Sequence, residues 1–215
     1  MNSFRELLIA IKPNNDALLL DFIEEDVIRC YFEYFRAYHT FDEHILPGLH
    51  LLNSVKGLCN NKKLVRLAWW YHDIIYVPGS SNSEIISADK AYFDCIQLDY
   101  DERKATTVHK LVMATQHFKT VPQTQDEKLI HDLDLATLGG EPEDYEKYVK
   151  LIREEYKFIK SDRIFSQGRL QILEKFLNRD SIFITKYFQD NFEKRARDNL
   201  RREINTIKLS IPAPE

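Results

Sequence analysis

The chain has few of the residues that interrupt regular structure. Its 215 residues include only six glycines and seven prolines, whereas a protein built from many short strands needs frequent turns. No stretch approaches the roughly 20 apolar residues that cross a bilayer. The apolar run Leu7–Ile11 is too short for the core of an ordinary signal peptide. These absences favour long helices with short connections, in a protein of the cytoplasm that does not enter a membrane.

Cysteine and net positive charge are also scarce. Cys30, Cys59 and Cys95 lie far apart and form no CxxC pair, so we expect free, mostly buried thiols in a reducing compartment. The formal net charge of -4 argues against the broad basic surface that binds nucleic acid. Hydrophobic residues make up 44% of the chain, which is sufficient for the core of one large domain.

Apolar residues recur at intervals of three and four along most of the chain, which predicts an all-α protein. No useful length of the chain alternates with a period of two. The predicted helices cover, approximately, residues 19–38, 43–58, 62–76, 83–96, 101–115, 124–138, 142–159, 170–177 and 183–209. Residues 211–215 are expected to form a short disordered tail.

The most informative residues are His72 and Asp73, near the end of the aromatic and apolar segment 67–76. An ionised carboxylate is rarely buried without a partner. A divalent metal ion is the partner that best suits an imidazole and a carboxylate together. Because a turn follows at Pro78-Gly79, we expect the helix to deliver this pair to a pocket rather than to the deep core.

Further candidate metal ligands lie on both sides of this pair. His44 precedes His72 by 28 residues, which fits one helix, a turn and a second helix. His39 and His44 are five residues apart and therefore do not share one helical face. Asp132 and Asp134 follow downstream. Two imidazoles and two carboxylates suit borderline or hard divalent ions such as manganese, iron, zinc or magnesium.

The order of these residues resembles the HD superfamily of metal-dependent phosphohydrolases. The resemblance is closest to one branch of predicted phosphohydrolases. Its motifs here are Arg36–His39 with His44, Trp70–Tyr76, Asn82–Ala88, Ala114–His117, Asp132–Leu135 and Arg153–Tyr156. They cover about residues 30 to 180. The resemblance implies a single compact helical bundle over residues 1–215, extended by C-terminal helices.

The resemblance also implies an activity and a ligand set. Its metal ligands are His44, His72, Asp73 and Asp134, with His39 and Asp132 as the alternatives for the first and the last. The bound ion is manganese, iron, zinc, nickel, cobalt or magnesium, as one ion or two. The implied reaction is hydrolysis of a phosphoester or phosphoanhydride in a small phosphorylated molecule, with nucleotides among the candidate substrates.

Several other residues are candidates for catalysis and substrate binding. Glu84 or Asp73 could accept the proton of the attacking water, although an acidic residue such as Glu84 also stabilises the N-terminus of a helix. Arg36, Arg153 and Arg169 could clamp phosphate oxygens, and surface ion pairs are the alternative for each. The remaining candidates for contact with substrate are His39, Asn82 and His117.

Two non-enzymatic functions compete with this hypothesis. The helical pocket could be a regulatory module that binds a metal ion or a nucleotide without catalysis. The chain could also be a helical interaction protein, in which case His44, His72 and Asp134 would lie far apart. Assembly into a homo-oligomer is left open by the sequence.

Overall fold

The computed structural model describes residues 3–13, 16–55 and 57–210. Within these ranges the chain forms eleven α-helices, one π-helix and one 3₁₀-helix, and it contains no strand. The predicted all-α fold is therefore confirmed. The tail predicted for residues 211–215 lies outside the described residues.

The chain divides after Leu133 into two compact units. The single domain expected over residues 1–215 stays a prediction. In the described part of the chain, no helix combines the length and the apolar composition that a membrane crossing requires.

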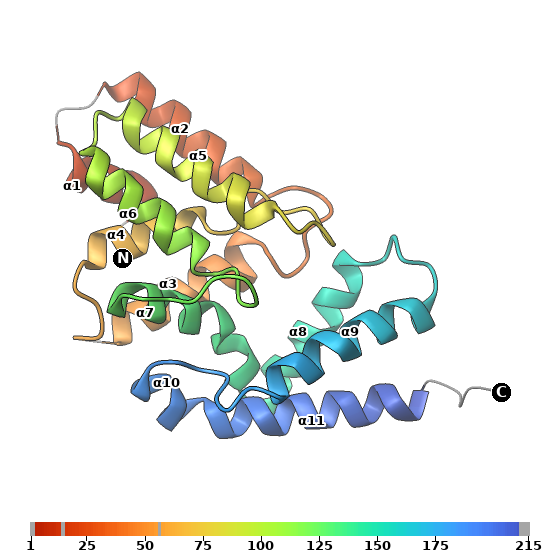
Figure 1. Cartoon of the computed structure of the whole chain (residues 1–215). Coiled ribbons are helices and arrows are strands. Elements are labelled where there is room, and N and C mark those ends of the chain that lie inside the picture. Colours follow the sequence, from red (N-terminus) through yellow and green to blue (C-terminus); the bar gives the residue numbers. More distant parts are fainter. Residues whose placement is uncertain (1–2, 14–15, 56, 211–215) are drawn as a thin grey trace. The chain divides into compact units, whose positions relative to one another are not determined.

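The first unit contains seven α-helices and the π-helix. They are α1 (Phe4–Ile11), α2 (Ala17–Cys30), η1 (Phe41–Ile45), α3 (Leu46–Ser54), α4 (Lys62–Tyr71), α5 (Ser83–Gln97), α6 (Glu102–Met113) and α7 (Gln125–Asp134). Helices α5 and α6 lie side by side, and α6 also packs on α4 (Figure 1). The last helix, α7, runs unbroken to Asp134, so the position of Asp134 follows from that helix.

Polar side chains fix the starts of the helices in the first unit. Ser3 and Glu6 form a reciprocal capping box at α1, while Asp16 and Asp101 accept backbone N–H groups at the starts of α2 and α6. Such caps satisfy amide groups that have no partner inside the helix, and each stabilises its helix by about 1 kcal/mol.

Helix α4 is shorter than predicted, because it ends at Tyr71 rather than at Tyr76. The backbone beyond it bonds to α5 instead of continuing the helix. The Ser87 hydroxyl accepts the Ile75 N–H and donates to the Ile75 carbonyl, and the Ser83 hydroxyl accepts the Val77 N–H. Since these bonds replace the helical ones, His72 and Asp73 lie in a turn that is tied to the first turns of α5.

Helix α2 is also shorter than predicted, because it ends at Cys30 and not near Tyr38. Tyr31 leaves the helix with its ring buried, and its hydroxyl donates to the Trp70 carbonyl at 2.8 Å. Thr40 then caps the π-helix η1. Pro47 does not break the next helix, since it lies in the first turn of α3, where a proline removes no helical hydrogen bond.

The second unit consists of η2 (Leu135–Gly139), α8 (Pro142–Glu155), α9 (Asp162–Leu177), α10 (Lys186–Asn191) and α11 (Glu193–Ser210). Pro142 occupies the first position of α8, as predicted. The single helix expected over 183–209 is instead divided at Phe192. Asn199 of α11 donates to the carbonyls of Leu138 and Gly140, which fixes η2 against α11.

The three cysteines form no disulfide. Cys95 is buried, while Cys30 and Cys59 are only half-buried. The prediction of free thiols is confirmed, but the expectation that most of them are buried is met by Cys95 alone. Burial raises the pKa of the Cys95 thiol to about 12, so this thiol stays protonated and unreactive at neutral pH.

Candidate metal centre

Four of the predicted ligands meet at one place. Each of His44, His72, Asp73 and Asp134 offers one ligand atom, and these atoms all lie within 4.8 Å of one another. His44 and His72 are 5% and 0% exposed, and the Asp73 side chain is 14% exposed. This confirms that the four residues form a buried group that could hold a metal ion, whereas an interaction protein with scattered polar residues would have kept them apart.

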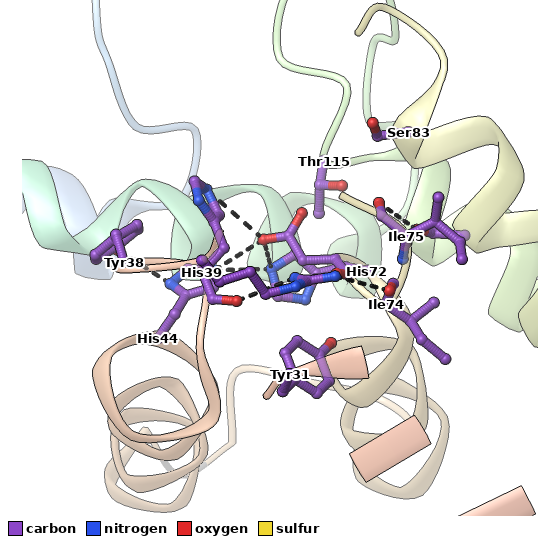
Figure 2. Close-up of polar contacts among 12 residues, drawn as sticks. Tyr31, Tyr38, His39, His44, His72, Ile74, Ile75, Ser83 and Thr115 are labelled. Carbon is purple, nitrogen blue, oxygen red and sulfur yellow. Dashed lines mark hydrogen bonds and ion pairs between the residues drawn. The ribbon is translucent and has the colours of Figure 1, made fainter. Parts of the chain in front are cut away.

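The two imidazoles face each other through the same ring atom. His44 Nε2 lies 2.9 Å from His72 Nε2. The other nitrogen of His72, Nδ1, lies 2.8 Å from the Trp69 carbonyl, which can only accept and therefore places the proton on Nδ1. In the neutral imidazole, His72 Nε2 then carries the lone pair, and this atom faces His44. Figure 2 shows Tyr38, His39, His44 and His72 gathered at this place.

A carboxylate oxygen completes a triangle with these nitrogens. Asp73 Oδ2 lies 3.1 Å from His72 Nε2 and 3.4 Å from His44 Nε2. Atoms that bind one cation at about 2.1 Å lie about 3.0 to 3.4 Å apart when they are neighbours around it. Two protonated imidazoles would place two positive charges 2.9 Å apart. A single divalent cation instead satisfies all three atoms, so the donor set fits a metal ion.

The charge of Asp73 is held by its histidine neighbours. Burial alone would raise the pKa of this carboxyl, but the imidazoles of His72, His39 and His44 keep it well below its ordinary value. Asp73 is therefore an ionised acceptor at neutral pH, which is the form that binds a cation.

An aromatic ring orients His72. The Trp69 indole stacks on the His72 ring with centroids 4.2 Å apart and an angle of 20°. Its Nε1–H donates to the Ile45 carbonyl at 2.9 Å. Gly48 allows this close approach, because a Cβ at that position would lie 2.0 Å from Trp69 Cζ2. The sequence does not indicate this role of Trp69 and Gly48, since a Pro47-Gly48 pair is more typical of a helix break.

Tyr38 performs the corresponding function for His44. Its hydroxyl lies 3.0 Å from His44 Nδ1, and its ring is buried. Outer partners of this kind fix the orientation of a ligating imidazole and raise its affinity for metal. In the sequence, the only indication of this role is that Tyr38 belongs to the Arg36–His39 motif, next to His39.

His39, the alternative to His44, lies beside the group rather than within it. Its Nε2 is 4.0 Å from Asp73 Oδ2, and its ring stacks on Tyr76 with centroids 4.0 Å apart. This position is compatible with the predicted contact between His39 and a substrate, which stays a prediction.

Asp132, the alternative to Asp134, is fully buried and pairs with a different residue. Its Oδ1 lies 3.1 Å from His131 Nδ1, and the group of four residues contains Asp134 instead. The predicted substrate contact His117 packs edge-on against His131, with ring centroids 4.8 Å apart. His117 therefore lies beside the His131–Asp132 pair of α7.

Two of the arginines predicted to clamp phosphate donate to groups of the protein itself. The Arg36 side chain is completely buried and donates to backbone carbonyls of the chain itself. Arg153 donates to the carbonyls of Tyr156 and Ile159 and pairs with Asp162, which holds the connection between α8 and α9. Both guanidinium groups are thus engaged within the protein, and their contact with phosphate stays a prediction.

The loop that follows the His72-Asp73 turn carries the last two candidates. Asn82 is exposed, and its side-chain oxygen accepts the Ser81 hydroxyl. Glu84 is half-buried in the first turn of α5. Because Ser83 bonds to the Val77 backbone, this segment folds back toward the turn. The catalytic role of Glu84 and the substrate contact of Asn82 stay predictions.

The chain was also compared with known proteins. No protein-family model, no curated protein and no solved structure matches it.

Proposed function

We propose that this chain is a metal-dependent phosphohydrolase of the HD type. It would cleave a phosphoester or phosphoanhydride in a small molecule, with nucleotides as the first substrates to test. The observation that carries the proposal is the triangle of His44 Nε2, His72 Nε2 and Asp73 Oδ2, with sides of 2.9, 3.1 and 3.4 Å. Together with Asp134, these atoms supply the His, His-Asp and Asp ligands typical of that superfamily.

The residues of the chain would divide the work as follows. His44, His72, Asp73 and Asp134 hold the ion, with His72 oriented by Trp69. When bound, a divalent ion lowers the pKa of a coordinated water and polarises a phosphoryl oxygen. Two carboxylate ligands reduce the positive charge of such a site, so a nearby base contributes more to catalysis.

Glu84 and Asp73 are the candidate bases. Asp73 is held ionised by its histidine neighbours, and Glu84 stands on the segment that bonds back to the His72-Asp73 turn. His39 would contact the substrate from the side of Asp73, because its Nε2 lies 4.0 Å from Asp73 Oδ2. We place the enzyme in the cytoplasm.

A non-catalytic module that binds a metal ion or a nucleotide is the second candidate. The engagement of Arg36 and Arg153 within the protein favours it, because both guanidinium groups already donate to acceptors of the chain. This candidate shares the metal centre with the first and differs only in turnover.

One experiment separates the two candidates. The full chain is stripped with a chelator, reloaded with manganese, cobalt, nickel or magnesium, and assayed on aryl phosphates, nucleotides and cyclic nucleotides. We expect hydrolysis of at least one class only with metal, loss of metal and activity together in His72→Ala, and retention of both in His50→Ala, which changes an exposed histidine of α3. Metal binding without turnover would favour the regulatory module. Activity that persists in metal-free His72→Ala protein would refute a metal-dependent reaction at this site.

A further inference from the structure

Arg36 is a buried cation that makes no part of the proposed ligand set. It lies in the segment between α2 and η1, and its side chain is 0% exposed. Burying a guanidinium is unfavourable unless the surrounding groups accept its hydrogen bonds. A carboxylate oxygen of Glu33 lies 2.9 Å from Nε and accepts one of them. The acceptors of the other nitrogens show what this arginine does.

These acceptors are backbone carbonyls from two separate segments. Arg36 Nη1 donates to the His39 carbonyl at 3.0 Å and to the Asp73 carbonyl at 2.8 Å. Nη2 donates to the Ile74 carbonyl at 2.9 Å. One rigid side chain thus joins the segment that carries His39 to the turn that carries Asp73.

The faces of the guanidinium are also in contact with rings. Arg36 Cζ lies 5.3 Å from the ring centroid of Tyr31 and 5.5 Å from that of Tyr76, distances at which a cation is attracted to an aromatic face. The Tyr76 ring in turn stacks on His39. Arg36 therefore restrains His39 twice, through its carbonyl and through the ring against its imidazole.

We propose that Arg36 is a positioning residue of the metal centre, whose guanidinium fixes Asp73 and His39 relative to each other without touching the ion. The inference rests on the proposed metal site. Only arginine suits this place, because several acceptors require a planar group with donors in fixed directions, whereas a lysine ammonium presents a compact charge on a flexible stem. The segment from Arg36 to Asp73 thereby behaves as one preformed unit before any ion or substrate arrives.

The test compares Arg36→Lys with Arg29→Lys, using Co²⁺ alone as the probe. Arg29 is a matched control, because it also pairs with an acidic residue three positions earlier but is 79% exposed. The measurements are the Co²⁺ dissociation constant, the visible spectrum of the bound Co²⁺ and the thermal melting of the metal-free protein. We expect Arg36→Lys to weaken Co²⁺ binding by about 10- to 100-fold and to change the spectrum, whereas Arg29→Lys matches the unmodified chain.

A merely structural arginine gives a different result. It would lower the melting temperature of Arg36→Lys and leave the dissociation constant and the spectrum unchanged, which overturns the inference. A second variant, Arg36→Ala, is titrated with methylguanidinium, which should restore Co²⁺ affinity where methylammonium does not. If neither variant folds, Glu33→Gln is used to test the proposal. Glu33 is the half-exposed partner of Arg36 Nε, so it can be changed without exposing the core. It should weaken Co²⁺ binding by about twofold to fivefold, and unchanged binding rejects the proposal.

If the proposed metal site itself is wrong, the Co²⁺ titration gives a third result. In that case the unmodified chain itself binds no Co²⁺, whatever residue occupies position 36.

Discussion

Each unit of this protein contains a buried polar cluster, and the two clusters are built on opposite principles. In the second unit, Arg169 donates to both carboxylate oxygens of Glu203 at 2.8 and 3.2 Å, and the Tyr145 hydroxyl donates to the same carboxylate. Burial, with the charge of Glu203 next, raises the pKa of Tyr145, so its phenol remains a donor. Donors meet acceptors, and the two unit charges cancel.

In the first unit the nitrogens and oxygens that face each other are all potential acceptors. His72 Nε2, His44 Nε2 and Asp73 Oδ2 converge, while the outer nitrogens of both rings already have partners in Trp69 and Tyr38. The charges of the second cluster cancel within the cluster, so it needs no ion. The first cluster could hold a metal ion and is therefore the candidate site, whereas the second is a structural element.

The largest effect is expected from a substitution that disrupts the first cluster. His72→Ala removes one of four ligands, and because each ligand supplies about 2.5 to 4 kcal/mol of a typical structural metal site, metal affinity should fall by about 100- to 1000-fold. A competition titration against a fluorescent chelator measures it. His50→Ala should leave the affinity unchanged, and equal affinities in all three proteins would argue against the assignment.

The next largest effect is expected from a substitution that disrupts the second cluster. Glu203→Leu leaves Arg169 buried without its carboxylate, which should lower the free energy of unfolding by about 3 to 5 kcal/mol. Urea unfolding of the metal-free protein measures this loss. The double variant Arg169→Met with Glu203→Leu should recover most of it, since it removes both buried charges. A double variant that is less stable than the single one would contradict this account of the cluster.

A third change acts on the support of the first cluster. In Gly48→Ala the new methyl group collides with the Trp69 ring, as the 2.0 Å separation from Cζ2 shows, so we expect a loss of about 1 to 3 kcal/mol in stability together with weaker metal binding. Gly168→Ala in α9 is the control, because a Cβ there meets nothing within 4 Å. This control should gain about 0.5 to 1 kcal/mol. Denaturant titration of both variants distinguishes crowding from helix propensity.

A smaller effect removes one hydroxyl next to the first cluster. Tyr38→Phe deletes the group that lies 3.0 Å from His44 Nδ1 and keeps the buried ring. We expect metal affinity to fall by about tenfold with little change in the stability of the metal-free protein. Tyr34→Phe, which alters a tyrosine that is 93% exposed, should have no effect on affinity measured by the same titration.

The smallest effect concerns a carboxylate of the second unit. Glu193 accepts the N–H groups of Ile182 and Phe183. Burial raises its pKa, but these bonds and Arg197 outweigh burial and lower it. Because the pKa of Glu193 is lower in the folded protein, its carboxylate stabilises the fold at pH values above its pKa in the unfolded chain, which is about 4.3. This stabilisation is lost as the pH falls through the pKa of the folded state. Glu193→Gln should therefore melt about 2 to 4 °C lower at pH 7, with a gap that narrows toward pH 4. A gap independent of pH would show that the charge is not involved.

Candidate metal ligands can be predicted from the sequence, because metal binding depends on the types of residue present and on their order. The order of residues along the chain narrows the ligands to the His72-Asp73 pair, one of His39 and His44, and one of Asp132 and Asp134, and the structure groups His44, His72, Asp73 and Asp134. Asp132 and Asp134 differ only in their rotation about α7, so the sequence leaves both open. In the structure Asp132 pairs with His131.

The sequence could not predict which arginines bind the chain itself. Arg36 and Arg153 have the same chemistry as a phosphate clamp, and their role depends on which carbonyls the tertiary structure turns toward them. The helix ends were missed for a related reason. Apolar periodicity continues past Tyr71, but the Ser83 and Ser87 hydroxyls capture the backbone there, and such long-range bonds are not visible in a local pattern.

Anomalous diffraction from crystals of the full chain grown with Co²⁺ tests the central claim most directly. We predict one cobalt peak per chain, at about 2.0 to 2.3 Å from Nε2 of His44, Nε2 of His72 and a carboxylate oxygen each of Asp73 and Asp134. A cobalt ion bound elsewhere, or crystals without bound cobalt in which the two Nε2 atoms remain in direct contact, would contradict the claim.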